Sequence, residues 1–285
     1  MVAVFRFALR RLLGGLCVLI VCVYACAASA AEGQPWQDTA LAAMVRDALG
    51  IAQNEPIPPE ALARITALCL YGDTLFLADA PPPDTFLSGS VASLADLTHF
   101  PALTDLTIWH QPVADLAPLS QLVDLKRLSL TQLPVSDLSP LAALSGLTAL
   151  SVRDTDAADV SPLSGLTGLT SLRLPRNRLT DALPLASLTG LEELWLPSNS
   201  ITSLQGLETL TGLQRLDLYD NEITDLSPLA GLTRLTWLSV DQNPVTDAAP
   251  LAGLKRLRTL YITYREPGAT KRGLAALLPK AYISE

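Results

Sequence analysis

Aromatic and acidic side chains suited to binding a partner recur in the C-terminal half of this 285-residue sequence. Two tryptophans and two tyrosines follow one another at intervals of 24, 18 and 24 residues, and two aspartates lie among them. The set consists of Trp195, Asp217, Tyr219, Trp237, Asp241 and Tyr261. Large aromatic side chains on an exposed surface are typical anchors of interfaces, and nearby charges steer and register a partner. The pattern therefore predicts a binding surface.

The same sequence offers little material for catalysis. His99 and His110 are the only histidines, and no nucleophile or acid lies beside His110 at a motif spacing. Gly-rich phosphate loops, paired cysteine motifs and HExxH are missing. A hydrolase built from Glu193, Asp217 and Asp241 needs one carboxyl group with a raised pKa, and we expect an open, wet strand surface not to supply it. We predict no catalytic residue, cofactor or metal, with a hydrolase as a remote alternative.

A 22-residue period decides where these side chains lie. One clear copy, from Leu213 to Arg234, reads LQRLDLYDNEITDLSPLAGLTR. The copies start at Leu103, Leu125, Leu147, Leu169, Leu191, Leu213, Leu235 and Leu257. Positions 3 to 7 alternate polar and apolar residues, which predicts a short strand that turns positions 4 and 6 toward a core. Because one copy cannot bury its apolar edge alone, the copies must stack into a solenoid with one parallel sheet.

Polar columns at other positions have structural explanations. Position 9 is asparagine in Asn177, Asn199, Asn221 and Asn243, where the amide is expected to bond the backbone of its own turn and of the neighbouring copy. Position 13 is aspartate in Asp115, Asp137, Asp159, Asp181, Asp225 and Asp247, and proline usually follows at position 16. This pair predicts a capped, very short helical turn. A calcium ladder along the aspartates is the weaker alternative.

These repeats resemble the bacterial leucine-rich repeat family, specifically its internalin-like 22-residue class. The motif L-x-x-L-x-L-x-x-N-x-I-x-D-L-x-P-L-x-x-L-x-x is matched closely from Leu213 to Arg234. The resemblance implies an α/β repeat fold: a horseshoe solenoid with a parallel sheet on its concave face, 3-10 or other short turns on its convex side, and a helical N-terminal cap. It also implies that the concave face binds a partner, usually a protein. We use "open face" for this surface, meaning positions 3, 5, 7 and 8 of each copy.

Five segments are expected along the chain. They are a signal peptide at 1–30, a helical N-terminal cap at 31–64, a first irregular repeat with an insertion at 65–102, leucine-rich repeats at 103–264 and a C-terminal cap at 265–285. In the irregular repeat, Ile65, Leu68 and Leu70 are predicted to face the core. Cys69 points to the open face as a small apolar filler rather than a reactive thiol, and the insertion occupies 72–90.

The N-terminal segment predicts export. Three arginines among the first eleven residues precede an uncharged apolar run from Leu12 to Ala28, and small residues follow. This order is typical of a secretory signal peptide, here cleaved after Ala30. The alternatives are an uncleaved anchor or a lipid on Cys26, and only these would attach the protein to a membrane. We predict a periplasmic or secreted protein.

The charge of the chain limits the classes of partner that it can bind. The chain has 20 Lys and Arg against 28 Asp and Glu, a net charge of −8, which disfavours nucleic acid. On the open face the earlier copies are basic and the later copies acidic and aromatic. The predicted partner-binding residues are Trp109, Arg127, Arg153, Arg173, Trp195, Asp217, Tyr219, Trp237, Asp241 and Tyr261. Ser239, on the same face, is expected to be exposed. The sequence thus predicts a monomeric, non-enzymatic module that binds a protein, or alternatively a glycan such as peptidoglycan.

Overall fold

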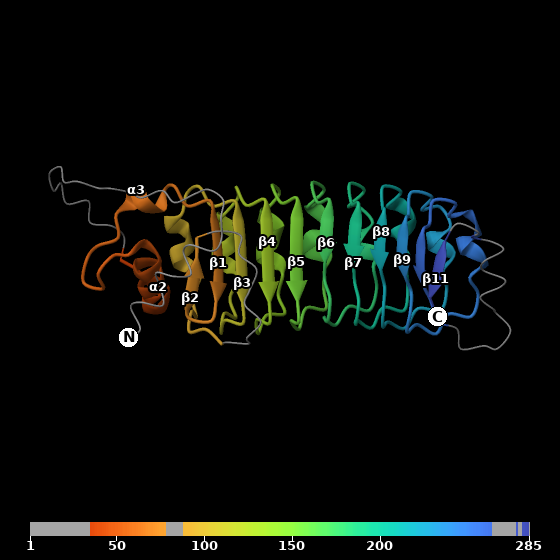
Figure 1. Cartoon of the computed structure of the whole chain (residues 1–285), viewed down its shortest axis with the longest axis horizontal. Helices are drawn as coiled ribbons and strands as arrows, with labels where there is room; N and C mark the ends of the chain where they lie inside the picture. Colours follow the sequence, from red (N-terminus) through yellow and green to blue (C-terminus); the bar gives the residue numbers. More distant parts are fainter. Residues whose placement is uncertain (1–34, 78–87, 264–277, 279–280, 285) are drawn as a thin grey trace. The chain divides into compact units, whose positions relative to one another are not determined.

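An 11-stranded sheet runs the length of the solenoid in the computed structural model (Figure 1), which describes residues 35–77, 88–263, 278 and 281–284. The chain divides into units of residues 1–32 and 33–285, and all described residues belong to the second. The strands are β1 (Ala67–Tyr71), β2 (Thr74–Phe76), β3 (Asp105–Trp109), β4 (Arg127–Thr131), β5 (Ala149–Arg153), β6 (Ser171–Arg173), β7 (Glu193–Trp195), β8 (Arg215–Asp217), β9 (Trp237–Ser239), β10 (Thr259–Tyr261) and β11 (Tyr282–Ser284). Their order is β11-β10-β9-β8-β7-β6-β5-β4-β3-β1-β2.

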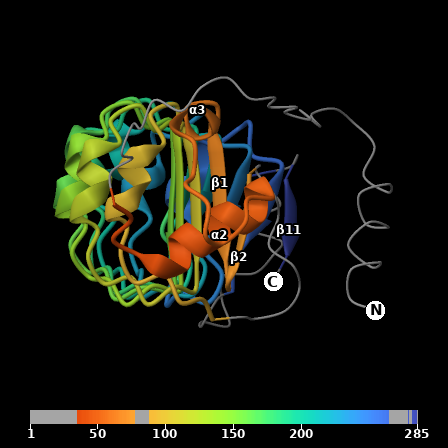
Figure 2. The same cartoon turned by 90° about the vertical axis from the view of Figure 1, so that its left-hand side faces the viewer.

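Short 3-10 helices return the chain on the side opposite the sheet, as the end-on view shows (Figure 2). They are η2 (Ala95–His99), η3 (Ala117–Gln121), η4 (Ser139–Ala143), η5 (Ser161–Gly165), η6 (Leu183–Leu185), η7 (Leu207–Thr209), η8 (Ser227–Leu229) and η9 (Ala249–Gly253). Parallel pairing aligns equal repeat positions, so that Leu216 lies between Leu194 and Leu238. These leucines are 0% exposed. The predicted leucine-rich repeat solenoid and its inward register are confirmed.

The asparagine column ties each copy to the one before it. The amide nitrogen of Asn221 donates to the carbonyls of Leu196 (3.0 Å) and Leu218 (3.1 Å), and its Oδ1 accepts from the N–H of Ile201 at 3.0 Å. Asn243 repeats this arrangement one copy later. Where the column holds Gln111 instead, the longer amide donates to the Gly72 carbonyl at 2.8 Å. The predicted structural role is confirmed.

The aspartate column closes the turns on the convex side. In all six copies Oδ1 accepts from the backbone N–H two residues later, at 2.8–3.0 Å. In Asp137, Asp159 and Asp225 the hydroxyl and the backbone N–H of the serine two residues later lower the carboxyl pKa. These carboxylates are therefore already engaged. Among the described residues no group of three or more His, Cys, Asp or Glu side chains is placed to hold a metal ion.

The N-terminal cap is built on helices α2 (Thr39–Leu49) and α3 (Pro59–Leu62). Asp38 caps α2 by accepting from the N–H of Leu41, and its second oxygen accepts from Ala92 (2.8 Å) and Ser93 (2.9 Å) of the irregular repeat. Burial raises the pKa of Asp38, but the backbone N–H groups of these residues together hold it below the usual value. The helix ends at Gly50, whose φ of 70° suits glycine.

Two strands lie in segments that the sequence treated as irregular. β2 pairs antiparallel with β1 inside the predicted insertion, and β11 extends the sheet within the predicted C-terminal cap. The predicted signal peptide, Cys26 and most of both segments lie outside the described residues. In the part of the chain that the structure describes, no helix combines the length and apolarity needed to span a membrane.

Candidate functional site

Three aromatic rings form a continuous ridge across the C-terminal half of the open face. The ring centroids of Trp195 and Trp237 lie 5.2 Å apart at an interplanar angle of 28°, and those of Trp237 and Tyr261 lie 5.7 Å apart. We call Trp195, Trp237 and Tyr261 the aromatic ridge. At its N-terminal end the Arg173 guanidinium carbon lies 5.2 Å from the Trp195 ring centroid, a cation–π contact. The ridge thus unites residues from β7, β9 and β10, with Arg173 of β6 at its end.

The ridge passes over β8 and shelters a carboxyl group. Trp195 and Trp237 lie on β7 and β9, which flank β8, and the register sets Asp217 beside both Trp195 and Ser239. Burial raises the pKa of Asp217, and the N–H of Tyr219 (3.0 Å) and the Ser239 hydroxyl only partly offset this effect. Our expectation that the open face cannot raise a carboxyl pKa is therefore wrong here, because two indoles lean together over this strand. The same cover accounts for Ser239, which we expected to be exposed but which is only 5% exposed.

The raised pKa of Asp217 predicts a specific dependence of stability on pH. The folded chain holds this proton more tightly than the unfolded chain, so Asp217 lowers the free energy of unfolding progressively as the pH rises from the unfolded pKa through the folded pKa. We expect Asp217→Asn to raise the melting temperature at pH 7 and to lose this advantage below pH ~4, where the unfolded group is also protonated. Thermal melts from pH 3 to 8 test this. An equal gain at every pH would contradict it.

Two further aspartates follow β8 and β9, the strands that carry Asp217 and its neighbour Ser239. The backbone N–H of Asp220 donates to the carbonyl of Asp241 at 3.0 Å, and the Asp241 carboxylate accepts from the hydroxyl of Thr263. We call Asp217, Asp220 and Asp241 the acidic trio. Among the described residues none of the three forms an ion pair. Tyr219, 41% exposed, lies between two of them in the sequence.

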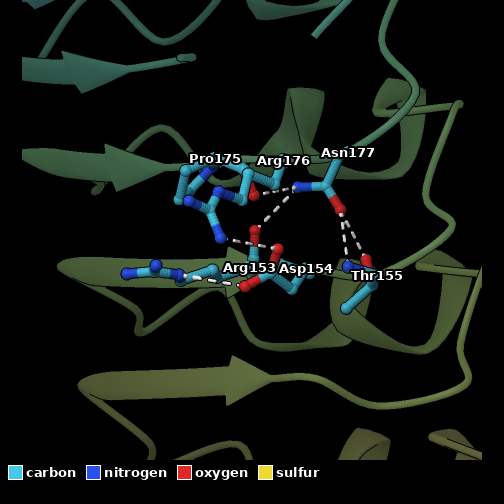
Figure 3. A network of polar contacts seen from close by, with 7 residues as sticks. Arg153, Asp154, Thr155, Pro175, Arg176 and Asn177 are labelled. Carbon is cyan, nitrogen blue, oxygen red and sulfur yellow. Dashed lines mark hydrogen bonds and ion pairs between the residues drawn. The ribbon is translucent and has the colours of Figure 1, made fainter. Parts of the chain in front are cut away.

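The arginines of the earlier copies are paired. Arg153 lies 3.2 Å from Asp154, which also faces Arg176 at 3.7 Å, and Figure 3 shows this network beside the bonds between Asn177 and Thr155. In the same way, Arg173 and Arg215 share Glu193, at 3.1 Å and 3.4 Å. Arg127 pairs with Asp105. Exposed pairs of this kind contribute little stability, but they neutralise the basic half of the predicted charge pattern.

Repeat position 8 is a turn rather than a strand position. His110, Gln132, Asp154, Arg176, Ser198, Asp220 and Gln242 all have φ between 50° and 57°, in the left-handed region. Our assignment of position 8 to the open face is therefore wrong. Its side chains project from the turn that follows each strand, and not from the strand itself.

Comparisons with known proteins agree with this architecture. The family described as Leucine Rich repeats (2 copies) matches residues 189–231. Internalin C2 from Listeria monocytogenes is 30% identical, with a TM-score of 0.70, over 79% of this chain and 93% of that protein. This chain belongs to the bacterial internalin-like leucine-rich repeat family. Internalin F from the same bacterium is 25% identical, with a TM-score of 0.58, over 87% of this chain and 91% of its own. No curated protein sequence matches the chain.

Not all predicted binding residues of this internalin-like chain come together. Trp109 lies on β3 and packs edge-on against Tyr71, with ring centroids 5.9 Å apart, far along the sheet from the aromatic ridge. Between the two aromatic regions the open face is hollowed by about 490 Å³. Small residues form its floor, among them Ser129, Ala149, Ser151 and Ser171. The sequence reasoning missed this hollow because small side chains form no motif.

A second hollow of about 440 Å³ lies at the turns after β3 to β5, where Ser88 Oγ is 3.4 Å from His110 Nε2. Spacing in the sequence places no nucleophile beside His110, but the fold brings Ser88, at the end of the insertion, next to it. An acyl-transfer pair also needs an acid on the other ring nitrogen. His110 Nδ1 is buried without a partner among the described residues, so the pair lacks that orienting group.

Cys69 is 1% exposed and lies on β1 between Phe76 of β2 and Thr107 of β3. This burial agrees with an apolar filler, since a reactive thiol must be reached by its substrate.

Proposed function

We propose that this internalin-like protein is an exported, non-enzymatic module that binds a protein partner through the C-terminal half of its concave, open face. The observation that carries the proposal is the aromatic ridge, whose three rings make one apolar strip over four strands. Aromatic side chains dominate the energetics of protein interfaces because they bury large areas with few rotatable bonds. Membership of the internalin-like family supports the same class of function.

Stabilisation of the sheet is the competing explanation for the ridge. Cross-strand aromatic pairs contribute roughly 0.2–1 kcal/mol, so the ridge does have some structural value. However, the rings also shelter Asp217, whose burial works against folding. Stability alone gives no reason to keep a sheltered carboxyl group there. Groups that reduce stability are common at functional sites.

A glycan is the second candidate partner, and one observation favours it. The exposed rings lie beside carboxylates, and sugars can stack on aromatic faces while their hydroxyl groups bond to carboxylates. Peptidoglycan would be within reach of an exported protein. The binding experiment therefore includes a sedimentation arm with peptidoglycan.

Trp237 is the central ring, so its replacement tests the proposal most directly. We expect Trp237→Ala to weaken capture of the protein partner from envelope extract by about 30-fold, equivalent to ~2 kcal/mol for a central anchor. Trp237→Phe, which keeps an aromatic ring, is the matched control and should retain most binding. Far-UV circular dichroism first establishes that both variants fold. Capture is then measured with the wild type and each variant immobilised, at several concentrations of extract.

If Trp237→Ala captures the partner as well as the wild type does, the ridge is not part of the binding site. Sedimentation with peptidoglycan that Trp237→Ala loses and Trp237→Phe retains would establish the glycan alternative instead.

A further inference from the structure

The C-terminal half of the open face keeps an excess of acidic side chains after its ion pairs are taken into account. From residue 191 to residue 263, positions 3, 5 and 7 carry one cation, Arg215, and three anions, which gives a net charge of 1 − 3 = −2. The anions are Glu193, Asp217 and Asp241, and Asp220 adds a fourth at the turn that follows β8. Glu193 is already engaged by Arg173 and Arg215, so the excess negative charge lies on the trio.

The ridge itself shows what kind of group its rings accept. At the end where a cation is available, the Arg173 guanidinium lies over the Trp195 ring, 5.2 Å from its centroid. Among the described residues Trp237 and Tyr261 have no such cation, and Tyr261 is 36% exposed. A guanidinium or ammonium group is attracted to the face of an aromatic ring, and more strongly when a carboxylate lies nearby.

We propose that the aromatic ridge and the acidic trio together bind a cationic side chain, lysine or arginine, on an extended segment of the protein partner. This inference rests on the proposed function and adds the chemistry of the partner. The cation lies against Trp237 and Tyr261 and is shared by Asp217 and Asp241, while its aliphatic stem covers the ridge. Because a nearby cation favours the ionised form of a carboxyl group, its arrival also relieves the penalty of keeping Asp217 sheltered.

The four tryptophans provide a direct readout. With 15N-labelled indoles, the chain gives one signal each for Trp36, Trp109, Trp195 and Trp237. The probe is an acetylated eight-residue Gly/Ser peptide with two lysines, titrated to millimolar concentration at low salt. We expect it to shift the signals of Trp195 and Trp237 and to leave those of Trp36 and Trp109 in place. Matched peptides carrying glutamate or norleucine instead of lysine should have little effect.

A charge-matched pair of variants tests the carboxylates. Asp217→Asn/Asp241→Asn should weaken lysine-peptide binding by about fivefold, since each pair is partly exposed. Asp124→Asn/Glu222→Gln removes the same charge from exposed side chains at other repeat positions and should leave binding unchanged. Raising the salt from 10 to 150 mM should weaken binding to the wild type, because screening shortens the range of the attraction.

Three results would overturn the inference: no indole shift, an equal response to the norleucine peptide, or equal weakening in both double variants. If the protein partner is nevertheless lost in Trp237→Ala, the proposed function stands and only its cationic chemistry fails. If lysine-peptide binding is found but partner capture does not depend on Trp237, the site exists and the proposed function fails.

Discussion

Replacing Leu216 with alanine is expected to lower the free energy of unfolding by about 2–5 kcal/mol. Leu216 is 0% exposed and lies in register between Leu194 and Leu238 in the continuous column of position 4. Truncation removes apolar burial and leaves a cavity that two neighbouring copies line. The closely packed column has little freedom to collapse into that cavity, so the loss should fall well within this range.

Leu183 provides a control with the same chemical change. It lies on the convex side at the start of η6 and is 51% exposed, so Leu183→Ala removes little buried area. We expect a loss below about 1 kcal/mol. Urea unfolding followed by tryptophan fluorescence and by far-UV circular dichroism measures both variants. Similar losses for the two would mean that the inward register is incorrect, and probes that disagree would reveal stepwise unfolding along the solenoid.

The periodic part of the fold could be predicted from the sequence because it repeats. A residue such as Leu216 has the same surroundings in every copy, so its place in the core follows from the 22-residue spacing alone. The same reasoning identified the asparagine and aspartate columns, whose bonds are local or reach one copy away. Segments that occur once, such as β2 and β11, offer no internal comparison, and their strands were missed.

The candidate site could be predicted only in part. The sequence identified Trp195 and Trp237 but not the shelter they give Asp217, because that depends on how two side chains lean across an intervening strand. The contact between Ser88 and His110 depends on where the insertion re-enters the fold, which no spacing reveals.

Some of the ion pairs, by contrast, could have been predicted from residue spacing. Arg127 and Asp105, like Arg215 and Glu193, occupy position 3 of adjacent copies, 22 residues apart. In a parallel sheet with this register such residues lie side by side. The rule that opposite charges 22 residues apart form pairs would have predicted the pairs of Arg127 and Arg176, but not those of Arg153 and Arg173, whose partners lie 1 and 20 residues away.

Replacing Asn221 with alanine is expected to lower the free energy of unfolding by about 3 kcal/mol. Asn221 is 7% exposed, and its loss leaves the N–H of Ile201 without its acceptor, while the carbonyls of Leu196 and Leu218 each lose one of two amide donors and keep the other, from Asn199 and Asn243. Unsatisfied backbone groups in the interior retain their desolvation penalty. Asn54→Ala, at an exposed position in the N-terminal cap, is the matched control and should change stability by less than about 0.5 kcal/mol.

Asn221→Asp separates the amide's hydrogen bonds from its packing, because the side chain keeps its shape. One carboxylate oxygen can still accept from Ile201, but the other would face the carbonyls of Leu196 and Leu218, to which the amide nitrogen donates. The ionised form is disfavoured there, so the folded pKa of this aspartate should rise and its protonated form should donate one of the lost bonds. The loss of stability relative to the wild type should therefore be smallest below pH ~4 and grow as the pH rises through the folded pKa. Urea unfolding at pH 4 and pH 7 measures this difference. A loss that does not change with pH would show that the column stabilises the stack through packing, and not through the bonds that link one copy to the next.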